Sequence, residues 1–336
     1  MVYSISAESL KADLSFLSSD ALAGRSSPSL GLGVAAEFIA SRFRGAGLQP
    51  GGLSGYFQPA IIENHIAKSP GLQDLRGPEI VNNVIAILPG ADPVLKKTYV
   101  FLTAHYDHLG TTQTAGREAA DHPTPASPDQ IYNGANDDGS GTVSVIAIAE
   151  ALARIQPRPK RSIVFALFFG EELGLLGSSY YMQNPTVPIA DIVSDVNLEQ
   201  IGRTDSTEGP ELSKFSLTGT GYSNVPVLLK CAAAKLGVAT YLDSGNDDYF
   251  TRSDNVSFAR KGVPAHTLCV AFDFPDYHRV SDEWQKINYV NMAKIDRAIA
   301  LGILDLADCR KRPTWNPSSP KTMTFREAER ERLQTR

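Results

Sequence analysis

At five places in this chain of 336 residues, acidic or histidine side chains stand at the edge of an apolar run. The five segments are His105-Tyr106-Asp107-His108, Asn136-Asp137-Asp138, Glu171-Glu172, Asn197-Leu198-Glu199 and Asp276-Tyr277-His278. Imidazole nitrogens and carboxylate oxygens are common zinc ligands. A carboxylate beside a metal-activated water also serves as a general base. These residue types therefore suit a metal site with a proton acceptor beside it, provided that the fold brings the segments together.

The first segment has the spacing of a metal ligand and its supporting carboxylate. His105 and Asp107 are two residues apart, so they project to the same side of an extended chain. An imidazole binds zinc through one nitrogen while a carboxylate holds the N–H of the other. Taken alone, the segment is also compatible with a capped strand end. We interpret His108 and His266 as structural histidines of the core.

Two further segments place acidic residues side by side. Adjacent side chains of an extended chain point in different directions, so one carboxylate of Glu171-Glu172 can bind a cation while the other remains free for proton transfer. Each pair also has a structural alternative, because acidic residues are favoured at the beginning of a helix. Glu199 and His278, taken alone, are compatible with polar residues at strand exits.

The pattern between these segments predicts an α/β protein. Strands are expected at Val81–Leu88, Tyr99–Ala104, Ser162–Phe169, Ile192–Leu198, Phe215–Thr218 and Val263–Ala271, and helices at Ala7–Leu17, Val34–Phe43, Thr142–Ala153, Leu173–Met182, Pro226–Leu236, Tyr289–Leu306 and Phe325–Leu333. Alternation of the two predicts a mixed, mostly parallel central sheet with helices on both faces. Ligands of such sheets bind beyond the carboxyl ends of the strands, where the five segments lie.

The composition excludes several classes of protein. A 42% hydrophobic content is enough for a sizeable core, and a net charge of −5 argues against a nucleic-acid binder held by phosphate contacts. Three cysteines cannot form a disulfide framework. We find neither a transmembrane segment nor a secretory leader, so the sequence leaves the compartment open.

Taken together, the segments resemble the M28 family of zinc-dependent peptidases, most of which are aminopeptidases with two zinc ions. The resemblance is carried by His105–Gly110, Asn133–Thr142, Arg161–Ser178 (RSIVFALFFGEELGLLGS), Asn197–Arg203 (NLEQIGR), Ser253–Ala265 (SDNVSFARKGVPA) and Pro275–Asp282 (PDYHRVSD). The stretch Leu17–Pro50 also looks like the usual beginning of the family's domain. The resemblance implies a zinc-exopeptidase fold.

The resemblance implies a role for each segment. His105 and His278 match the imidazole ligands, Asp137 the carboxylate that bridges two zinc ions, and Glu172 and Glu199 the terminal carboxylate ligands. Glu171 matches the general base, and Asp107 matches the residue that supports His105. The bond between Asp137 and Asp138 is often cis in this family.

The expected ligands also agree with the chemistry of the site. Three carboxylates and one bridging hydroxide would balance the charge of two zinc ions, whereas the carboxylates without metal would repel one another. The chain departs from the family at Glu199, where Asp is common, and at Gln200, where an apolar residue is common. The extra methylene of Glu199 displaces its carboxylate, which puts the second ion in doubt.

The predicted function is therefore hydrolysis of N-terminal residues from peptides with a free amine, through a zinc-bridging hydroxide and the base Glu171. Tyr249, Phe250 and Phe272, with Phe274, are candidates for an apolar first pocket, although aromatic residues there are equally compatible with core packing. The alternatives are a single-zinc glutaminyl cyclase, for which Asp137, Glu172 and His278 would suffice, and a non-catalytic relative. The oligomeric state stays open.

We expect a single zinc peptidase domain over residues 1–310, with a helical beginning at 1–50 and a catalytic core at 80–310. Only Pro59–Lys97 separate the beginning of the domain from the strand before the first histidine motif, and this segment is too short for a protease-associated insert. Residues 311–336 are expected to form a charged tail that is solvated or loosely docked. The habit of the family favours a secreted or periplasmic protein, and a cytoplasmic location remains open.

Overall fold

The computed structural model describes residues 2–62, 79–115, 128–207, 209–242 and 245–334. The strands of the main sheet are β1 (Gln49–Pro50), β2 (Phe57–Ile62), β3 (Glu79–Leu88), β4 (Tyr99–His105), β7 (Ser162–Phe168), β8 (Ile192–Glu199), β11 (Lys214–Leu217), β12 (Ala239–Tyr241) and β13 (Ala265–Cys269). The helices are α1 (Ala7–Leu17), α2 (Leu30–Gly45), α4 (Gly141–Ala153), α5 (Leu176–Gln183), α6 (Val225–Ala234), α7 (Asn255–Ala259), α8 (Tyr289–Asp308) and α9 (Met323–Gln334). Two small sheets pair β5 (Gly110–Thr111) with β6 (Ile131–Tyr132) and β9 (Asp205–Ser206) with β10 (Gly209–Pro210).

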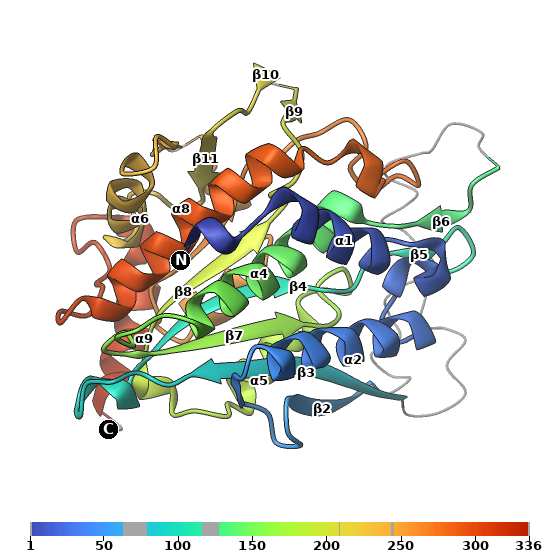
Figure 1. Cartoon of the computed structure of the whole chain (residues 1–336). Coiled ribbons are helices and arrows are strands. Elements are labelled where there is room, and N and C mark those ends of the chain that lie inside the picture. The colour runs from blue at the N-terminus through green and yellow to red at the C-terminus, as the bar shows by residue number, and fades with distance from the viewer. Residues whose placement is uncertain (1, 63–78, 116–127, 208, 243–244, 335–336) are drawn as a thin grey trace.

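The centre of the main sheet is parallel and its flanks are mixed (Figure 1). Strand β4 lies between β7 and β8 and runs parallel to both, and β13 continues the parallel arrangement beside β8. Strand β3 is antiparallel to β7, and β11 is antiparallel to β13. The predicted mixed, mostly parallel sheet is confirmed. Because parallel strands share their direction, the carboxyl ends of β7, β4, β8 and β13 lie along one edge of the sheet.

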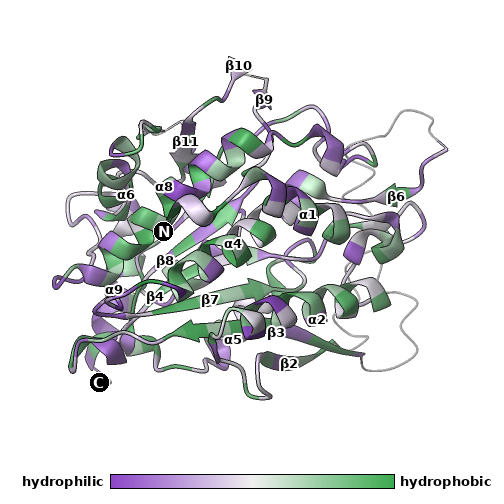
Figure 2. Ribbon diagram, in the orientation of Figure 1, coloured by the Kyte–Doolittle hydropathy of each residue, from purple (hydrophilic) through white to green (hydrophobic). Residues whose placement is uncertain are grey.

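Helices cover both faces of the sheet, as predicted. In β7, Phe165 and Leu167 belong to a core that also contains apolar residues of α1, α2, α4 and α8. The alternate residues Val164, Ala166 and Phe168 belong to a second core, with apolar side chains of α5 and α7. A strand with apolar side chains on both faces is typical of a sheet covered on both sides. Figure 2 shows the central strands and α4 as the most hydrophobic part of the molecule.

Helix α2 begins four residues earlier than predicted. The sequence-based boundary at Val34 treats Gly31 and Gly33 as loop residues. In the structure the side chain of Ser29 accepts a hydrogen bond from the backbone N–H of Leu32 at 3.0 Å, which caps the helix before both glycines. A Cβ at Gly31 would lie 1.9 Å from the carbonyl oxygen of Leu22, so only glycine permits this close approach.

The expectation of a solvated or loosely docked tail is wrong. Trp315 is only 3% exposed and packs with Phe325 in the second core. Arg332 of α9 donates hydrogen bonds to the carbonyl oxygens of Ile189, Ile192 and Gly262. The charged composition of the tail concealed these anchors, because a few buried side chains suffice to dock a helix whose outer face is charged.

Two further expectations concern the whole chain. Residues 63–78, within the segment Pro59–Lys97, lie outside the described residues, so the single domain without an insert stays a prediction. The second expectation is that the chain has no transmembrane segment. In the described part of the chain, none of the helices has the length and apolarity to cross a bilayer.

Candidate metal centre

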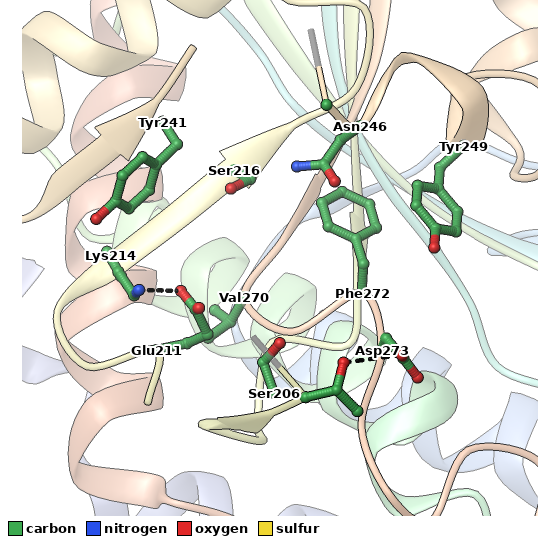
Figure 3. A pocket seen from close by; sticks show the side chains of 12 residues that line it. Ser206, Glu211, Lys214, Ser216, Tyr241, Asn246, Tyr249, Val270, Phe272 and Asp273 are labelled. Atoms are coloured by element: carbon green, nitrogen blue, oxygen red, sulfur yellow. Dashed lines mark hydrogen bonds and ion pairs between the residues drawn. The ribbon is translucent and has the colours of Figure 1, made fainter. Parts of the chain in front are cut away.

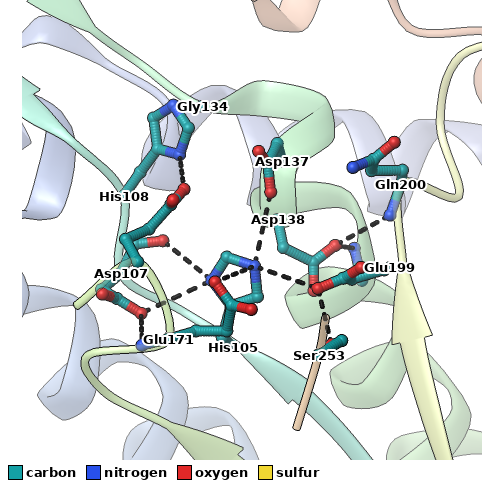
Figure 4. A network of polar contacts seen from close by, with 12 residues as sticks. His105, Asp107, His108, Gly134, Asp137, Asp138, Glu171, Glu199, Gln200 and Ser253 are labelled. Carbon is teal, nitrogen blue, oxygen red and sulfur yellow. Dashed lines mark hydrogen bonds and ion pairs between the residues drawn. The ribbon is translucent and has the colours of Figure 1, made fainter. Parts of the chain in front are cut away.

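All five segments singled out from the sequence meet at the carboxyl edge of the parallel strands. His105 is the last residue of β4, and Glu199 is the last residue of β8. Glu171 and Glu172 follow β7 after a turn at Gly170, whose φ of 65° suits glycine. Figure 4 shows side chains from these separate segments pointing toward His105.

Asp137 occupies the middle of the cluster, in the irregular turn η5 (Ala135–Ser140) before α4. Its Oδ1 lies 3.4 Å from Nε2 of His105, and its Oδ2 lies 3.1 Å from Nε2 of His278. The two oxygens of one carboxylate thus face two different imidazoles. The peptide bond between Asp137 and Asp138 is cis, as the family resemblance implies.

Each imidazole has a further carboxylate beside it. Nε2 of His105 lies 3.6 Å from Oε1 of Glu199, and Nε2 of His278 lies 3.2 Å from Oε2 of Glu172. The structure therefore forms two imidazole–carboxylate groups that share Asp137. The family resemblance implied Asp137 as the shared ligand, but it did not say which imidazole lies beside which terminal carboxylate.

Glu171 and Asp107 both lie beside His105. Oε2 of Glu171 is 4.0 Å from Nε2 of His105, and Oδ1 of Asp107 is 3.4 Å from Nδ1 of the same ring. The backbone N–H of Glu171 also donates a hydrogen bond to Oδ1 of Asp107 at 3.1 Å. Asp107 consequently links the expected base to the expected ligand. Its carboxylate can orient both.

His108 contributes a third imidazole that the sequence analysis assigned to the core. Its Nδ1 lies 2.7 Å from Oε1 of Glu172, and it forms a group with Asp137 and Glu172 that could hold a metal ion. Its ring is also 5.8 Å from that of His278. The spacing His105-x-x-His108 was the signal available in the sequence, since the residue follows a strand that ends at the site.

The donor atoms of the cluster fit a divalent cation. Among the described residues, no hydrogen bond of regular geometry reaches the buried atoms Nε2 of His105, Oδ2 of Asp137 or Oε1 of Glu172. Buried polar atoms without partners are costly, and several of them gathered in one cluster indicate a missing ligand. Nitrogen and oxygen donors in this combination suit zinc.

The electrostatics of the cluster agree with a cation site. Burial would lower the pKa of His278, but the adjacent Glu172 and Asp137 outweigh it and raise that pKa to about 11. Burial likewise opposes protonation of His105, yet the surrounding carboxylates, with Glu171 foremost, raise its pKa well above the ordinary value. A metal ion must compete with protons for these imidazoles. Metal binding must displace these protons and is therefore favoured by higher pH.

The turn around Asp137 is fixed by neighbouring acidic and amide side chains. The carboxylate of Asp282 accepts hydrogen bonds from the backbone N–H groups of Asn136 and Asp137, at 2.9–3.1 Å. Oδ1 of Asp138 accepts from the backbone N–H of Gln200 at 3.1 Å. The loop that carries His278 is fixed in the same way. Its Asp276 accepts hydrogen bonds from Arg203, Lys286 and Ser281.

Arg25 supports the site through the backbone and was also missed. Its buried guanidinium donates to the carbonyl oxygens of Leu17, Tyr106, Asn133 and Gly134 at 2.5–3.1 Å. It therefore joins the loop after β4 to the turn before α4. The only signal in the sequence was the dipeptide Gly24-Arg25. Every residue type has a backbone carbonyl, so the residue types of the acceptors do not reveal these hydrogen bonds.

A cavity of about 300 Å³ opens beside the cluster. Its walls include Asp137, Glu171, Glu172, Glu199, Gln200, Thr218, Tyr249, Arg252, Thr267, Phe272, Asp273, Tyr277 and His278. Tyr249 and Phe272, two of the predicted pocket residues, lie in this wall with their rings stacked at 5.1 Å.

For the other two aromatic candidates, the prediction of a place in the pocket is wrong. Phe250 is 2% exposed and packs against Tyr222, His266 and Phe325, so it belongs to the core and not to the cavity wall. Phe274 is also buried and lies under the guanidinium of Arg203. Periodicity could not separate these residues from their neighbours, because the segments that carry them are irregular.

A second cavity of about 470 Å³ (Figure 3) shares part of its wall with the first. Tyr249, Phe272 and Asp273 are common to both walls. The second wall is largely polar and includes Lys214 in an ion pair with Glu211 at 2.8 Å. The stacked rings therefore line both cavities.

Comparison with known sequences connects this geometry to one family. The profile of peptidase family M28 matches residues 83–303. Leupeptin-inactivating enzyme 1 of Streptomyces exfoliatus is 29% identical over 219 residues, which are 64% of this chain and 41% of that protein. A probable zinc metalloprotease of Pyricularia oryzae is 31% identical over 191 residues, which are 56% of this chain and 33% of that protein. The chain thus spans less than half the length of these relatives.

Solved structures share the fold at low sequence identity. BSAP, a zinc aminopeptidase from Bacillus subtilis, has a TM-score of 0.67 and 17% identity, over 92% of this chain and 97% of that one. An aminopeptidase from Aneurinibacillus sp. strain AM-1 has a TM-score of 0.63 and 16% identity, over 95% and 98% of the two chains. Glutaminyl cyclase of Porphyromonas gingivalis has a TM-score of 0.65 and 18% identity, over 88% and 96%. These likenesses establish the fold that positions the cluster.

Proposed function

Because the chain belongs to peptidase family M28, we propose that it is a zinc-dependent aminopeptidase that removes N-terminal residues from peptides. The observation that carries the proposal is the shared position of Asp137 between His105 and His278, each with its own carboxylate. Two donor groups joined by one carboxylate suit two zinc ions. We accordingly propose two ions per chain, held by His105 and Glu199 and by His278 and Glu172.

Zinc would supply an acidified water and a Lewis acid for the scissile carbonyl. Glu171 would take a proton from the attacking water and pass it to the leaving amine. Burial raises the pKa of Glu171 well above its ordinary value, which is the direction required of a group that both accepts and donates a proton. The hydrogen bond from its backbone to Asp107 would hold it beside His105.

The cavity supports the selection of a free N-terminus. Its walls carry several carboxylates, including Glu199 and Asp273, and a substrate ammonium group is attracted to such a lining. Tyr249 and Phe272 would contact the side chain of the first residue. A cavity of about 300 Å³ is at the lower end of the usual range for ligand sites, which suits one residue and not a long segment.

The proposal is tested by counting zinc and measuring peptide hydrolysis on the same preparation. We expect two zinc ions per chain and cleavage of several aminoacyl-p-nitroanilides, with none of their N-acetylated counterparts. Cleavage of the acetylated substrates at an equal rate would contradict selection of the free amine. Absence of hydrolysis in a fully loaded protein would favour a non-catalytic relative.

Glutaminyl cyclisation is the second candidate, because a cyclase shares the fold and needs only one imidazole–carboxylate group. Its signature would be release of ammonia from a peptide with N-terminal glutamine, together with one zinc per chain. The second group, formed by His105 and Glu199, favours hydrolysis. Export from the cytoplasm stays a prediction.

A further inference from the structure

Arg252 stands out among the residues that line the metal cavity. The wall contains five acidic residues, and Arg252 is its only arginine or lysine within the described part of the chain. The residue lies shortly after the turn η7 (Asp247–Tyr249) and one position before Ser253. Its side chain is exposed. A fixed cation beside a site that must attract both metal ions and a substrate ammonium works against both, so its presence calls for a ligand of its own.

The guanidinium is held by an aromatic wall. Its central carbon lies 5.0 Å from the ring centroid of Tyr249, whose ring stacks in turn on Phe272 at an angle of 21°. Stacking uses the face of a guanidinium and leaves the N–H groups at its edge available. The guanidinium therefore lies against Tyr249 in the cavity wall, where its N–H groups can reach a ligand.

The edge of this guanidinium is not used by the described residues. Within the described ranges its nitrogens make no hydrogen bond or ion pair with a carboxylate or carbonyl, in contrast to the buried arginines of the same chain. Arg203 donates to Asp205 and Asp276, and Arg161 donates to Thr98 and to two carbonyl oxygens. Arg203 and Arg161 thus use their donors within the fold, whereas the described residues leave the guanidinium donors of Arg252 available to another molecule.

We propose that Arg252 binds a carboxylate of the peptide substrate, so that the enzyme prefers peptides with an acidic group close to the scissile bond. This inference rests on the proposed aminopeptidase function and specifies its substrate class. The planar fork of an arginine matches a carboxylate through two parallel hydrogen bonds. The carboxylate has three sources, namely the side chain of the first residue, the side chain of the second residue, or the free C-terminus of a dipeptide.

Three matched pairs of substrates distinguish these sources. Glu-p-nitroanilide against Gln-p-nitroanilide tests the first residue, Leu-Glu-amide against Leu-Gln-amide the second, and Leu-Leu against Leu-Leu-amide the C-terminus. We expect kcat/KM of the zinc-loaded wild type to favour the acid by about tenfold in at least one pair, the usual value of a charge-assisted hydrogen bond. In Arg252→Gln the ratio should fall to one or below, because only the acidic wall remains.

The matched control is Arg260→Gln, the same change at an exposed arginine beside α7 and outside this cavity. It should retain the wild-type ratio, and Arg252→Lys should retain part of it. Thermal unfolding of each variant shows whether the fold is intact. A ratio near one in all three pairs of the wild type, or an unchanged ratio in Arg252→Gln, would overturn the inference while leaving the aminopeptidase function in place. Failure of the wild type to cleave any substrate would overturn both.

Discussion

Buried carboxylates occupy two contrasting environments in this protein. At the metal centre, Asp137 and Glu172 lie 3.1–3.2 Å from the ring nitrogen of His278. On helix α8, Asp296 is equally buried and lies beside Ser144 of α4. The described residues bring no histidine and no second carboxylate to Asp296 that would form a metal-binding group.

Within these two environments, Asp296 and Glu172 hold opposite charge states. Burial raises the pKa of Asp296 to about 8, so this side chain is largely neutral at pH 7. Burial acts in the same direction on Glu172, but His278 and His108 outweigh it and lower the pKa of Glu172 to about 2. A buried carboxylate alone does not make a site. Convergence with imidazoles makes one: beside His278 the positive charge keeps Glu172 ionised and ready to accept a metal ion, whereas burial still raises the pKa of Glu199, beside His105, to about 8.

The largest loss of metal binding and activity is expected when the shared carboxylate of Asp137 is neutralised. In Asp137→Asn, we expect zinc content to fall and kcat/KM to decrease by at least about 10³-fold, since metal activation contributes several kcal/mol. Zinc analysis and hydrolysis of an aminoacyl-p-nitroanilide on the same sample provide the measurement. Asp248→Asn, the same change at an exposed position, should leave both quantities unaltered. Wild-type zinc content and turnover in Asp137→Asn would contradict the shared role.

The adjacent glutamates separate metal binding from proton transfer. Glu171→Gln should retain zinc and lose about 10²–10⁴-fold in kcat, the usual contribution of a positioned acid–base group. Glu172→Gln should lose zinc as well as turnover, because the interaction with His278 is weakened. Equal zinc loss in both variants would remove the distinction between base and ligand, and full turnover in Glu171→Gln would contradict its role as base.

The positions of the expected ligands were predictable because they depend on strand direction. The predicted ends of β4 and β8 fall within one residue of the observed ends, at His105 and Glu199. Once a parallel sheet is inferred, residues that follow its strands must meet at one edge. The family resemblance added the assignment of individual roles, which neither spacing nor periodicity provides.

Other parts of the site depend on packing that the sequence does not display. His108 approaches Glu172 only because the loop after β4 folds over the cluster, held by Arg25. Phe250 and Tyr249 are neighbours in sequence, yet one faces the core and the other faces the cavity. In an irregular segment no period of 2 or 3.6 residues relates side chains to a face, so such assignments require the structure.

The predicted neutral state of buried Asp296 can also be tested, through the pH dependence of protein stability. Its pKa is about 8 in the folded protein, against an ordinary value of 3.8, so between these values the unfolded chain has lost a proton that the folded protein keeps. The folded state is therefore destabilised progressively as pH rises through this window. Asp296→Asn should be close to neutral at pH 4 and stabilise the protein at pH 7.5 by on the order of 5 kcal/mol.

Urea denaturation of wild type and variant at both pH values measures this effect, and the difference between the two proteins cancels the pH dependence of metal binding that they share. Asp305→Asn, a partly exposed position on the same helix, is the control and should show little change with pH. Destabilisation by Asp296→Asn at pH 7.5 would show that the carboxylate is ionised in the fold.

The smallest expected effect concerns the support of a single ligand. Ser253 donates a hydrogen bond from Oγ to Oε1 of Glu199 at 2.7 Å and accepts one from Nδ2 of Asn197 at the same distance. This chain of contacts fixes the carboxylate whose longer side chain departs from the family pattern. Ser253→Ala should weaken zinc affinity by about 10–100-fold, as loss of a supporting hydrogen bond does at other metal sites.

Competition with a chromogenic chelator resolves this effect, because it reports the two equivalents of zinc separately. The equivalent held by Glu199 should weaken while the other is retained. Ser257→Ala removes a buried hydroxyl that contacts Ser178 and no expected ligand, so it should leave both affinities unchanged. Equal weakening of both zinc affinities in Ser253→Ala would mean that the two imidazole–carboxylate groups bind metal as one unit. Asp137 would then couple the two groups, and they could not be described as separate sites that share one ligand.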